Sequence, residues 1–271
     1  FPNQMIISKK EIEKALENSK FEPYFQPIVS LETGKVVKCE VLARWVCSSG
    51  VITPGKFLTQ VQSLGFLEKM TNQIVEKAIK NCLFWNKTHH LNGVGISINY
   101  HYTQLVNDNS IDNLIFLISS TGISSKLVEI EVTETQVIEN YIMLTSSLNR
   151  LRKEGMSIAL DDFGVGSSSL STLKTIPVDT LKLDRSLVKS IEDCQVSRSI
   201  LEAVCCMANA IDLNLVVEGV ETKEQLSFID EFCDSAEIQG FLCAPPLPFE
   251  EFYCFAEMVN LNNFPLLSFF S

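Results

Sequence analysis

Short apolar runs alternate with helical segments through most of the chain, and this alternation constrains the fold more than any other feature. The runs are continuously apolar, as expected for parallel strands that are covered by helices. They predict strands at residues 94–99, 128–133, 157–162, 179–184, 213–218 and 237–239. Helices are predicted between and after them, at residues 111–120, 141–154, 169–174, 196–210, 223–229 and 249–259.

The first part of the chain departs from this rhythm. Apolar runs at residues 24–29 and 36–45 predict two strands joined by a tight turn at residues 32–35. Strands joined by so short a turn are antiparallel, because parallel strands need a long crossover. The predicted sheet therefore begins with one antiparallel pair.

Helices account for the rest of the N-terminal third. The capping box Ser8-Lys9-Lys10-Glu11 predicts a helix that ends near Lys20. Two more are predicted at residues 53–64 and 67–86, the first starting at Thr53-Pro54. About eight strands with as many helices, and no Pro/Gly/Ser-rich linker, indicate an α/β fold of the (β/α)₈ barrel type. We expect one domain over residues 1–271, in which residues 1–20 lead into the barrel.

The composition excludes some classes of function. The net charge is −11 and there is no Lys/Arg block, so a nucleic-acid polymer is not an expected partner. A hydrophobic content of 46% fits a globular domain with a large core. No run approaches ~18 apolar residues, so we expect no membrane contact by this domain itself.

The cysteines indicate a reducing compartment. There are nine, an odd number, mostly in apolar runs and without a C-x-x-C motif. This pattern predicts buried free thiols and gives no support to a zinc site.

Two adjacent carboxylates, Asp161 and Asp162, end one of the apolar runs and precede a glycine-bearing loop. Strand alternation would point them in opposite directions, and like charges so close need a cation or a donor. One interpretation is a metal site at the carboxyl end of a strand. The other is an Asp-rich turn that caps the next helix. The segment alone does not decide between them.

Acidic or amide side chains end nearly every predicted strand, and in a barrel these ends meet on one face. They are Glu40, Asn99, Glu131 with Glu134, Asp161 with Asp162, Asp184, Glu218 with Glu221, and Gln239. Any one has a simple explanation, such as a helix-start acid at Glu134 or a solvated turn residue at Asp184. The recurrence points to a site of oxygen ligands, which favours Mg²⁺ or Mn²⁺ over zinc.

Lys182 lies inside an apolar strand. It either pairs with the nearby carboxylates or extends its ammonium group toward solvent. His89, His90 and His101 fall in predicted loops, and nothing supports a Ser/His/Asp triad.

Eight motifs, in order, give the chain an end-to-end resemblance to EAL-domain cyclic di-GMP phosphodiesterases. They are Phe25-Gln26-Pro27-Ile28, Glu40-Val41-Leu42-Ala43-Arg44-Trp45, Ser97-Ile98-Asn99, Glu131-Val132-Thr133-Glu134-Thr135, Asp161-Asp162-Phe163-Gly164-Val165-Gly166, Leu181-Lys182-Leu183-Asp184-Arg185, Val217-Glu218-Gly219-Val220-Glu221-Thr222, and Gln239-Gly240-Phe241 before Pro246-Leu247-Pro248. The resemblance implies a modified barrel whose first strand is antiparallel, in agreement with the predicted hairpin.

The resemblance also implies a role for each matching residue. Two ions, Mg²⁺ or Mn²⁺, would be held by Glu40, Asn99, Glu131, Asp161, Asp162 and Glu218. Asp161 would bridge them, Lys182 and Glu218 would act on the attacking water, and Gln239 would support the water network. Glu134 would anchor the loop after Asp162. Substrate contacts would come from Gln26, Leu42, Arg44, Asp184 and Glu221, with Arg44 at a phosphate and Glu221 also supporting the site.

The activity implied is hydrolysis of one phosphodiester bond of cyclic di-GMP to linear pGpG, and the family often forms homodimers. The chain departs from the family at Val41, which is not a ligand, and at Val165 and Ser167 in the loop after Asp162. These loop changes put turnover in question. The alternative is therefore a receptor that binds cyclic di-GMP with little turnover. An unrelated metal-dependent barrel enzyme, such as an enolase-type lyase, would not explain Arg44, Asn99 and the loop together.

The segment Glu40–Trp45 followed by Gly50–Pro54 looks like EAL domains attached to a membrane-bound periplasmic sensor. The first residue is Phe1, so the chain looks like an excised domain. The resemblance implies a cytoplasmic output module of a protein anchored in the inner membrane.

Overall fold

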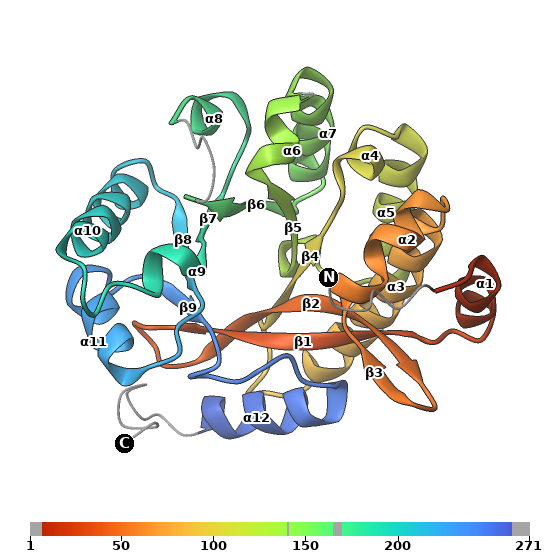
Figure 1. Ribbon diagram of the computed structural model, residues 1–271, viewed down its shortest axis with the longest axis horizontal. Helices are drawn as coiled ribbons and strands as arrows, with labels where there is room; N and C mark the ends of the chain where they lie inside the picture. Colours follow the sequence, from red (N-terminus) through yellow and green to blue (C-terminus); the bar gives the residue numbers. More distant parts are fainter. Residues whose placement is uncertain (1–6, 140, 165–169, 262–271) are drawn as a thin grey trace.

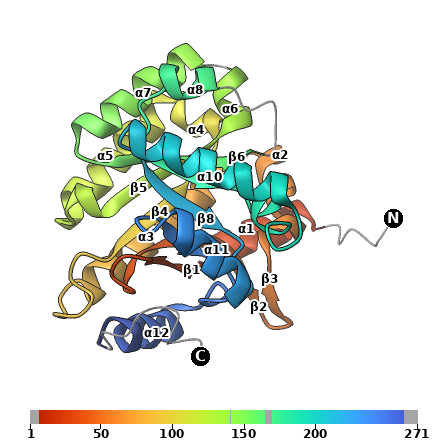
Figure 2. The ribbon, with the colours of Figure 1, turned by 90° about the vertical axis from the view of Figure 1, so that its left-hand side faces the viewer.

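Eight strands close into a barrel with helices around its outside (Figures 1 and 2). The structure is a computed structural model that describes residues 7–139, 141–164 and 170–261. The strand order is β1-β2-β4-β5-β6-β7-β8-β9 and back to β1. The strands are β1 Phe21–Ser30, β2 Val36–Cys47, β4 Gly95–Asn99, β5 Val128–Thr133, β6 Ser157–Phe163, β7 Thr180–Leu183, β8 Asn214–Glu218 and β9 Glu237–Gln239. The predicted α/β barrel is confirmed.

The first strand is the one that closes the barrel. β1 is antiparallel to β2, with Gln26 opposite Glu40, and antiparallel to β9, with Val29 opposite Ile238. The other neighbouring strands of the barrel are parallel. The β1–β2 turn contains Gly34 at a φ of 65°, a left-handed conformation that glycine adopts without strain. The predicted antiparallel hairpin is thus confirmed.

The helices lie on the outside of the barrel (Figure 1). They are α1 Lys9–Glu17, α2 Leu58–Ser63, α3 Leu67–Trp85, α4 Tyr102–Leu105, α5 Asp108–Thr121, α6 Glu134–Glu139, α7 Tyr141–Lys153, α8 Leu170–Thr175, α9 Arg185–Val188, α10 Gln195–Ala210, α11 Lys223–Phe232 and α12 Phe249–Leu261. The Ser8–Glu11 capping box is present as predicted. Among the described residues, no helix is long and apolar enough to cross a membrane.

One local prediction near the N-terminus is wrong, and one short strand was not predicted. The helix predicted over residues 53–64 is a 3₁₀ turn, Pro54–Lys56, followed by α2, and the Thr53 side chain makes no capping hydrogen bond. Residues 50–52 form β3, a three-residue strand paired with the end of β2. So short a strand leaves no periodic signal in the sequence.

An aromatic cluster fixes α3 and α12 against β1. The rings of Phe25 and Trp85 lie edge to face with centroids 5.3 Å apart, and Phe252 lies 5.0 Å from Trp85. All three side chains are fully buried. Trp85 Nε1 donates a hydrogen bond of 2.9 Å to the carbonyl of Val94, just before β4. The cluster thus joins two helices to the strands that carry Gln26 and Asn99.

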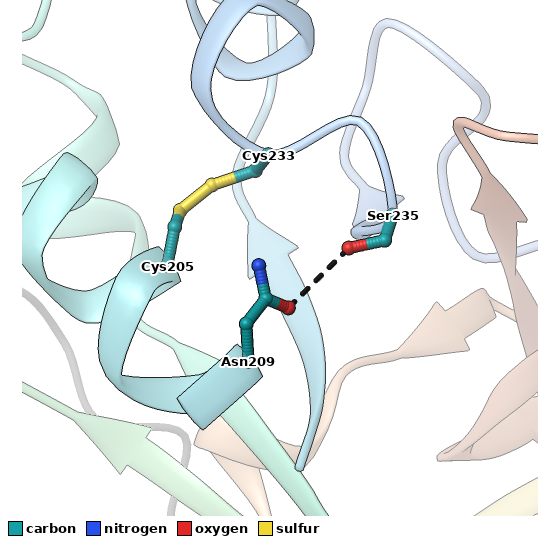
Figure 3. The surroundings of a disulfide bond; sticks show 4 residues. All are labelled: Cys205, Asn209, Cys233 and Ser235. Carbon is teal, nitrogen blue, oxygen red and sulfur yellow. Dashed lines mark hydrogen bonds between the residues drawn. A yellow bond between two sulfur atoms is a disulfide. The ribbon is translucent and has the colours of Figure 1, made fainter. Parts of the chain in front are cut away.

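The prediction of nine free thiols is wrong for one pair. Cys205 on α10 and Cys233 after α11 form a disulfide, with Cα atoms 5.8 Å apart (Figure 3). Packing of α10 against α11 places these distant residues within the range that a disulfide needs. The remaining seven cysteines are free, and Cys206 and Cys254 among them are exposed.

We expect the disulfide to contribute about 3.5 kcal/mol to the free energy of unfolding, because it closes a loop of 28 residues in the unfolded chain. Urea unfolding of Cys233→Ser, or of the wild type with dithiothreitol, should show this loss. Cys206→Ser is the matched control and should change stability by less than ~0.5 kcal/mol. Equal midpoints for all forms would contradict the crosslink.

Candidate functional site

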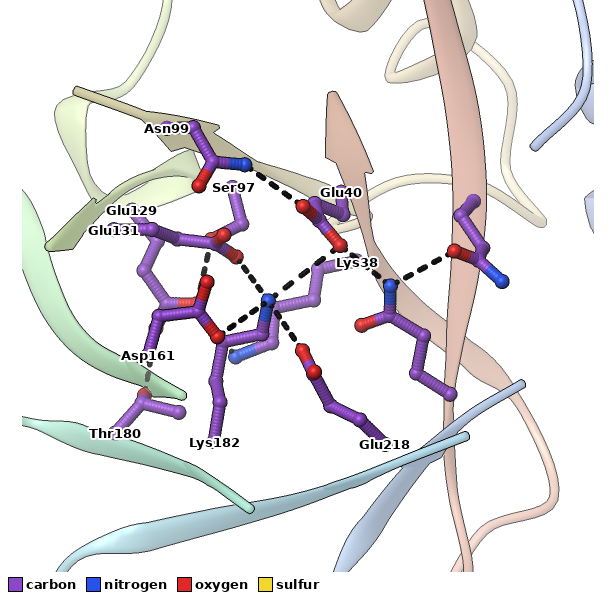
Figure 4. Close-up of polar contacts among 12 residues, drawn as sticks. Lys38, Glu40, Ser97, Asn99, Glu129, Glu131, Asp161, Thr180, Lys182 and Glu218 are labelled. Atoms are coloured by element: carbon purple, nitrogen blue, oxygen red, sulfur yellow. Dashed lines mark hydrogen bonds and ion pairs between the residues drawn. The ribbon is translucent and has the colours of Figure 1, made fainter. Parts of the chain in front are cut away.

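The ammonium group of Lys182 lies at the centre of a cluster of carboxylates inside the barrel (Figure 4). Lys182 Nζ is 2.7 Å from Glu218 Oε1 and 2.8 Å from Glu131 Oε1. It is 3.5 Å from Glu40 Oε2 and 3.6 Å from Asp161 Oδ1. The Lys182 side chain is 1% exposed, so these carboxylates replace solvent around its charge. The interpretation of Lys182 as a paired, buried lysine is confirmed.

Each barrel strand contributes one side chain to this layer. Gln26, Glu40, Asn99, Glu131, Asp161, Lys182, Glu218 and Gln239 come from β1, β2, β4, β5, β6, β7, β8 and β9. Parallel strands bring their carboxyl ends to one face, and the antiparallel β1 brings Gln26 there from the other direction. The predicted convergence of strand-end polar residues is confirmed as an arrangement in space.

Glu40 is held by two amides. Asn99 Nδ2 donates to Glu40 Oε1 at 2.7 Å, and Gln239 Nε2 donates to Glu40 Oε2 at 2.6 Å. Burial disfavours the charged form of Glu40, but the Lys182 ammonium and the two amides outweigh it and lower the pKa. Glu40 is therefore an ionised carboxylate with a fixed orientation.

Glu131 and Glu218 differ from Glu40 in their environment. Burial raises the pKa of Glu131 well above its usual value and that of Glu218 to about 7, although Lys182 acts in the opposite direction on both. The same carboxylates raise the pKa of Lys182, since they outweigh the effect of burial. Glu131 is 1% exposed; its Oε1 lies against the Lys182 ammonium group, whereas its Oε2 accepts no hydrogen bond. Such an acceptor is costly unless a cation or a donor reaches it.

The side chains of Asp161 and Asp162 point in different directions, as predicted: Asp161 into the barrel and Asp162 toward solvent. Asp161 faces Lys182 and accepts a hydrogen bond of 2.9 Å from the backbone N–H of Asp162. Asp162 is exposed and has a left-handed backbone, with a φ of 58°. Burial raises the pKa of both carboxyls. Val165 and Ser167, in the loop that follows, lie outside the described residues.

The donor chemistry of the cluster fits a hard divalent cation. Oxygen atoms of Glu40, Asn99, Glu131, Asp161 and Glu218 surround one volume, without histidine or cysteine (Figure 4). The buried Oε2 of Glu131, which accepts no hydrogen bond, is the observation that favours this fit. Lys182 Nζ stands at the point where the donors meet, and no group of three or more acidic, His or Cys side chains among the described residues already encloses a metal position.

The amide of Gln26 extends this layer toward the closure of the barrel between β1 and β9. Gln239 Nε2 also donates to Gln26 Oε1 at 3.1 Å, and Gln26 Nε2 donates to the carbonyl of Ala244 at 3.3 Å. Gln239 Oε1 is buried and accepts no hydrogen bond, so it offers an acceptor to a bound molecule. Gln26 and Gln239 thus lie beside Glu40.

A largely apolar cavity of ≈ 380 Å³ opens beside Glu40 and Asn99. Leu42 lines it, together with side chains of α2, α3 and the segment after β4. Arg44 lies two residues further along β2, half-buried, with its guanidinium 5.5 Å from the Tyr24 ring and donating to the carbonyl of Ala43. The cavity continues the site away from the carboxylates and is large enough for part of a small organic ligand.

Three predicted residues lie outside the cluster. Asp184 is the N-cap of α9 and accepts from Ser186 N at 2.8 Å. Glu221 is exposed, just before α11. Glu134 is buried as the first residue of α6. The structure gives Glu134 the helix-start position of its simpler explanation, whereas Asp184 is a helix cap and not the solvated turn residue of its own. Neither position tests the roles that the resemblance implies.

The sequence analysis missed the polar side chains of the cavity. His101 caps α4, and its Nε2 lies 3.1 Å from Gln62 Nε2. Gln104 is 5% exposed, and its Nε2 donates to no group. His101 therefore has a structural role instead of being a solvated loop residue. The spacing of His101 and Gln104 after the strand end is a capping-box pattern that could have revealed it.

The fold and this cluster define a barrel with an oxygen-ligand site at the carboxyl ends of its strands. The family model described as "EAL domain" matches residues 9–246, so the chain belongs to the EAL domain family.

Relatives and solved structures agree with this family. The cyclic di-GMP phosphodiesterase NbdA of Pseudomonas aeruginosa is 32% identical over 250 residues, which cover 90% of this chain and 31% of NbdA. The cyclic di-GMP phosphodiesterase RocR of the same organism is 33% identical, over 91% of this chain and 63% of RocR. The chain therefore spans less than two thirds of either relative. The PaMucR phosphodiesterase in complex with c-di-GMP superimposes with a TM-score of 0.83 at 27% identity, over 90% of this chain and 98% of PaMucR.

The pKa of Glu218 predicts how stability depends on pH in the metal-free protein. Below pH 4.5 the Glu218 carboxyl is protonated in both the folded and the unfolded protein, so it does not affect the free energy of unfolding. Between pH 4.5 and about 7 the unfolded protein loses this proton while the folded protein keeps it. Stability should therefore fall as pH rises through this window, by about 3 kcal/mol at 1.36 kcal/mol per pKa unit.

Urea unfolding in EDTA across this window, for the wild type and Glu218→Gln, tests this sign. The variant should gain on the wild type as pH rises, because its amide does not titrate. Parallel pH profiles of the two proteins would show that Glu218 is not protonated in the cluster at neutral pH.

Proposed function

We propose that this domain hydrolyses one phosphodiester bond of cyclic di-GMP to linear pGpG, in a reaction that needs Mg²⁺ or Mn²⁺. The observation that carries the proposal is the convergence of carboxylates from β2, β5, β6 and β8 on Lys182, with Asn99 of β4 bonded to one of them. Family membership and relatives named as cyclic di-GMP phosphodiesterases support the choice of substrate.

The proposed metal ligands are those that the resemblance implies. Glu40, Asn99, Glu131 and Asp161 would hold one ion, and Asp161, Asp162 and Glu218 a second. When bound, two such ions would lower the pKa of a water molecule and neutralise charge on the phosphodiester. The raised pKa values of Glu131, Asp161 and Glu218 support this assignment, because cations would take over the neutralisation that protons provide without them.

Lys182 and Glu218 are proposed to act on the attacking water. Their ion pair of 2.7 Å places a fixed donor and a fixed acceptor at one point of the cluster. Glu218 would accept a proton from the water, while Lys182 would hold the oxygen by donating to it. Gln239 would complete the water network through its unsatisfied Oε1.

The proposed hydrolysis changes no oxidation state, so it needs no redox cofactor. A bond forms between the water oxygen and phosphorus, and the bond from phosphorus to the ribose 3′ oxygen breaks. One water proton is taken up by the site and one proton ends on the released 3′ hydroxyl. The product is a linear dinucleotide with a 5′ phosphate.

The cavity beside Glu40 supports binding of one end of the dinucleotide. Its apolar lining, which includes Leu42, suits the faces of a purine, and Gln104 offers a buried donor to a base edge. We propose that Arg44 meets a phosphate and that Gln26, Asp184 and Glu221 make further contacts. Glu134, buried at the start of α6, would anchor the loop after Asp162.

The direct test is incubation with cyclic di-GMP and Mg²⁺ or Mn²⁺, followed by chromatography for pGpG. Turnover would support the proposal. Tight binding without product would replace it with the alternative, a cyclic di-GMP receptor of low turnover, for which the loop residues Val165 and Ser167 are the motive. Absence of both binding and product would overturn both.

Glu40→Ala should reduce hydrolysis by more than about 100-fold, because it removes a proposed metal ligand. Loss of an outer-shell partner typically costs only about 10–100-fold, and loss of a ligand should cost more. The same chromatographic assay measures the loss. Glu22→Ala is the matched control, since Glu22 lies on β1 but pairs with Lys77 outside the barrel at 2.7 Å. Normal turnover by Glu40→Ala would show that the proposed metal site is wrong.

The place of this domain in a longer protein and its oligomeric state are also proposals. The chain covers only part of NbdA and RocR, which supports the idea of one module in a longer protein. We propose that this module is the cytoplasmic output part of a protein anchored in the inner membrane. We also propose a homodimer, which the exposed apolar residues Ile142 and Met143 on α7 support.

Light scattering after size exclusion should give twice the mass of the 30.4 kDa chain. Ile142→Asp should shift the population to the single-chain mass, because it places a charge in the proposed contact. A monomer for the wild type at all concentrations would contradict the dimer.

A further inference from the structure

A second polar cluster lies inside the barrel, one layer below the site (Figure 4). We call it the basal layer. Its members are Lys38 on β2, Ser97 on β4, Glu129 on β5, Ser157 on β6, Thr180 on β7 and Glu237 on β9. Nothing in the proposed reaction uses these residues, although Ser97, Glu129 and Thr180 are buried.

Glu129 is the hub of the basal layer. Its Oε1 accepts from Lys38 Nζ at 2.9 Å and from Ser97 Oγ at 3.0 Å. Its Oε2 accepts from Thr180 Oγ1 at 2.6 Å and from Ser157 Oγ at 3.5 Å. One carboxylate therefore joins β5 to β2, β4, β6 and β7 through the inside of the barrel.

Lys38 links this cluster to β9, the strand that closes the barrel against β1. Its ammonium group also lies 3.1 Å from Glu237 Oε2 on β9. The side chains of Lys38 and Glu129 are only 13% and 7% exposed. Burial opposes both charges, but the mutual attraction outweighs it, lowering the pKa of Glu129 and raising that of Lys38. Lys38 and Glu129 thus form a buried ion pair.

The basal layer stands in register with the site. Lys38, Ser97, Glu129, Thr180 and Glu237 each lie two residues before a site residue on the same strand and face; these partners are Glu40, Asn99, Glu131, Lys182 and Gln239. Two residues of a strand span roughly 6.6 Å. A shift of any of these five strands along its axis would thus move a basal side chain and a site side chain together.

We propose that Glu129 is a positioning residue for the proposed phosphodiester hydrolysis, fixing β2, β4 and β7 so that Glu40, Asn99 and Lys182 meet Glu131 at one point. This inference rests on the proposed function for its kinetic part, and on the metal-ligand assignment for its binding part. Glu129 touches none of the reacting groups; it acts through the strands.

The directional bonds of Glu129 explain why a charged hub occupies this layer. A buried ion pair is often no more stabilising than apolar residues of the same volume, so stability alone gives no reason for it. Apolar packing tolerates small sliding movements, whereas four bonds to one carboxylate each set a distance and a direction. Outer-shell groups that hydrogen-bond the metal ligands commonly change metal affinity by 10–100-fold when they are lost, and Glu129 acts on the same ligands through their strands.

The test uses a pair of variants that differ in one group. Thr180→Val keeps the shape of the side chain and removes the hydroxyl that bonds Glu129, whereas Thr180→Ser keeps the hydroxyl. We expect Thr180→Val to weaken Mn²⁺ binding about 10-fold, measured by titration calorimetry of the metal-free 271-residue chain. Thr180→Ser should stay within threefold of the wild type. Equal affinities for the two variants would overturn the proposal.

Glu129→Gln tests the hub itself. It should weaken Mn²⁺ binding by about 10–100-fold and, at saturating Mn²⁺, lower kcat with little change in KM. Lys38→Met should act through the same hub, so the double variant should lose no more than Glu129→Gln alone. Additive losses would show that the two residues act separately and would contradict the proposal.

Lys77→Met is the matched control for stability. It breaks a lysine ion pair with Glu22 and bonds to the carbonyls of Ser19 and Phe21 on the outside of the barrel. It should lower the urea midpoint and leave Mn²⁺ affinity unchanged. If Mn²⁺ affinity followed the urea midpoint in all variants, Glu129 would have only a structural role. A wild type that binds Mn²⁺ without hydrolysing cyclic di-GMP would refute the proposed function and leave the binding test of Glu129 intact.

Discussion

The ion pairs between Lys182 and the carboxylates of Glu40, Glu131, Asp161 and Glu218 are the interaction on which the rest of the structure depends. One ammonium group cannot neutralise four carboxylates inside a barrel, so the remaining charge must be balanced by protons or by cations. Burial raises the pKa of Glu131 and Glu218, which favours protons in this role in the absence of metal. Cation binding to such a cluster is coupled to proton release.

The hairpin of β1 and β2 gives the site its asymmetry. In an all-parallel barrel every strand would bring its carboxyl end to the site, whereas β1 enters from the opposite direction and places Gln26 opposite Glu40. The amides of Gln26 and Gln239 then form a chain to Glu40 across the closure of the barrel. The long β2 continues to Leu42 and the apolar cavity. The carboxylate cluster and the apolar cavity are thus joined by one strand.

Much of this architecture could be predicted from the sequence, because it depends on short-range patterns. Continuous apolar runs marked the strands, and a four-residue turn predicted the antiparallel pair. Lys182 inside an apolar run left two alternatives, a buried partner or an ammonium group that reaches solvent. The Cys205–Cys233 disulfide and the cavity residue Gln104 could not be predicted in the same way. They depend on how helices pack against one another, which leaves no fixed spacing in the chain. The convergence of strand-end acids on one face was predicted, but in the described part of the chain Lys182 contacts only Glu40, Glu131, Asp161 and Glu218 of them. The second polar layer around Glu129 was not predicted.

The closure between β1 and β9 is short. Only Val29 with Ile238 and Ser30 with Glu237 are paired there, both at the end away from Gln26. Nearer the site, β1 pairs with the segment after β9 through a single bridge between Phe25 and Leu247, and the Gln26–Gln239 contact spans the interval. The wall of the barrel beside Glu40 is therefore held by side chains over a stretch where backbone bonds are few. Local opening of this closure would admit water to the carboxylates while the other seven strand pairs stayed intact. The carboxylate cluster would then become hydrated without global unfolding of the protein.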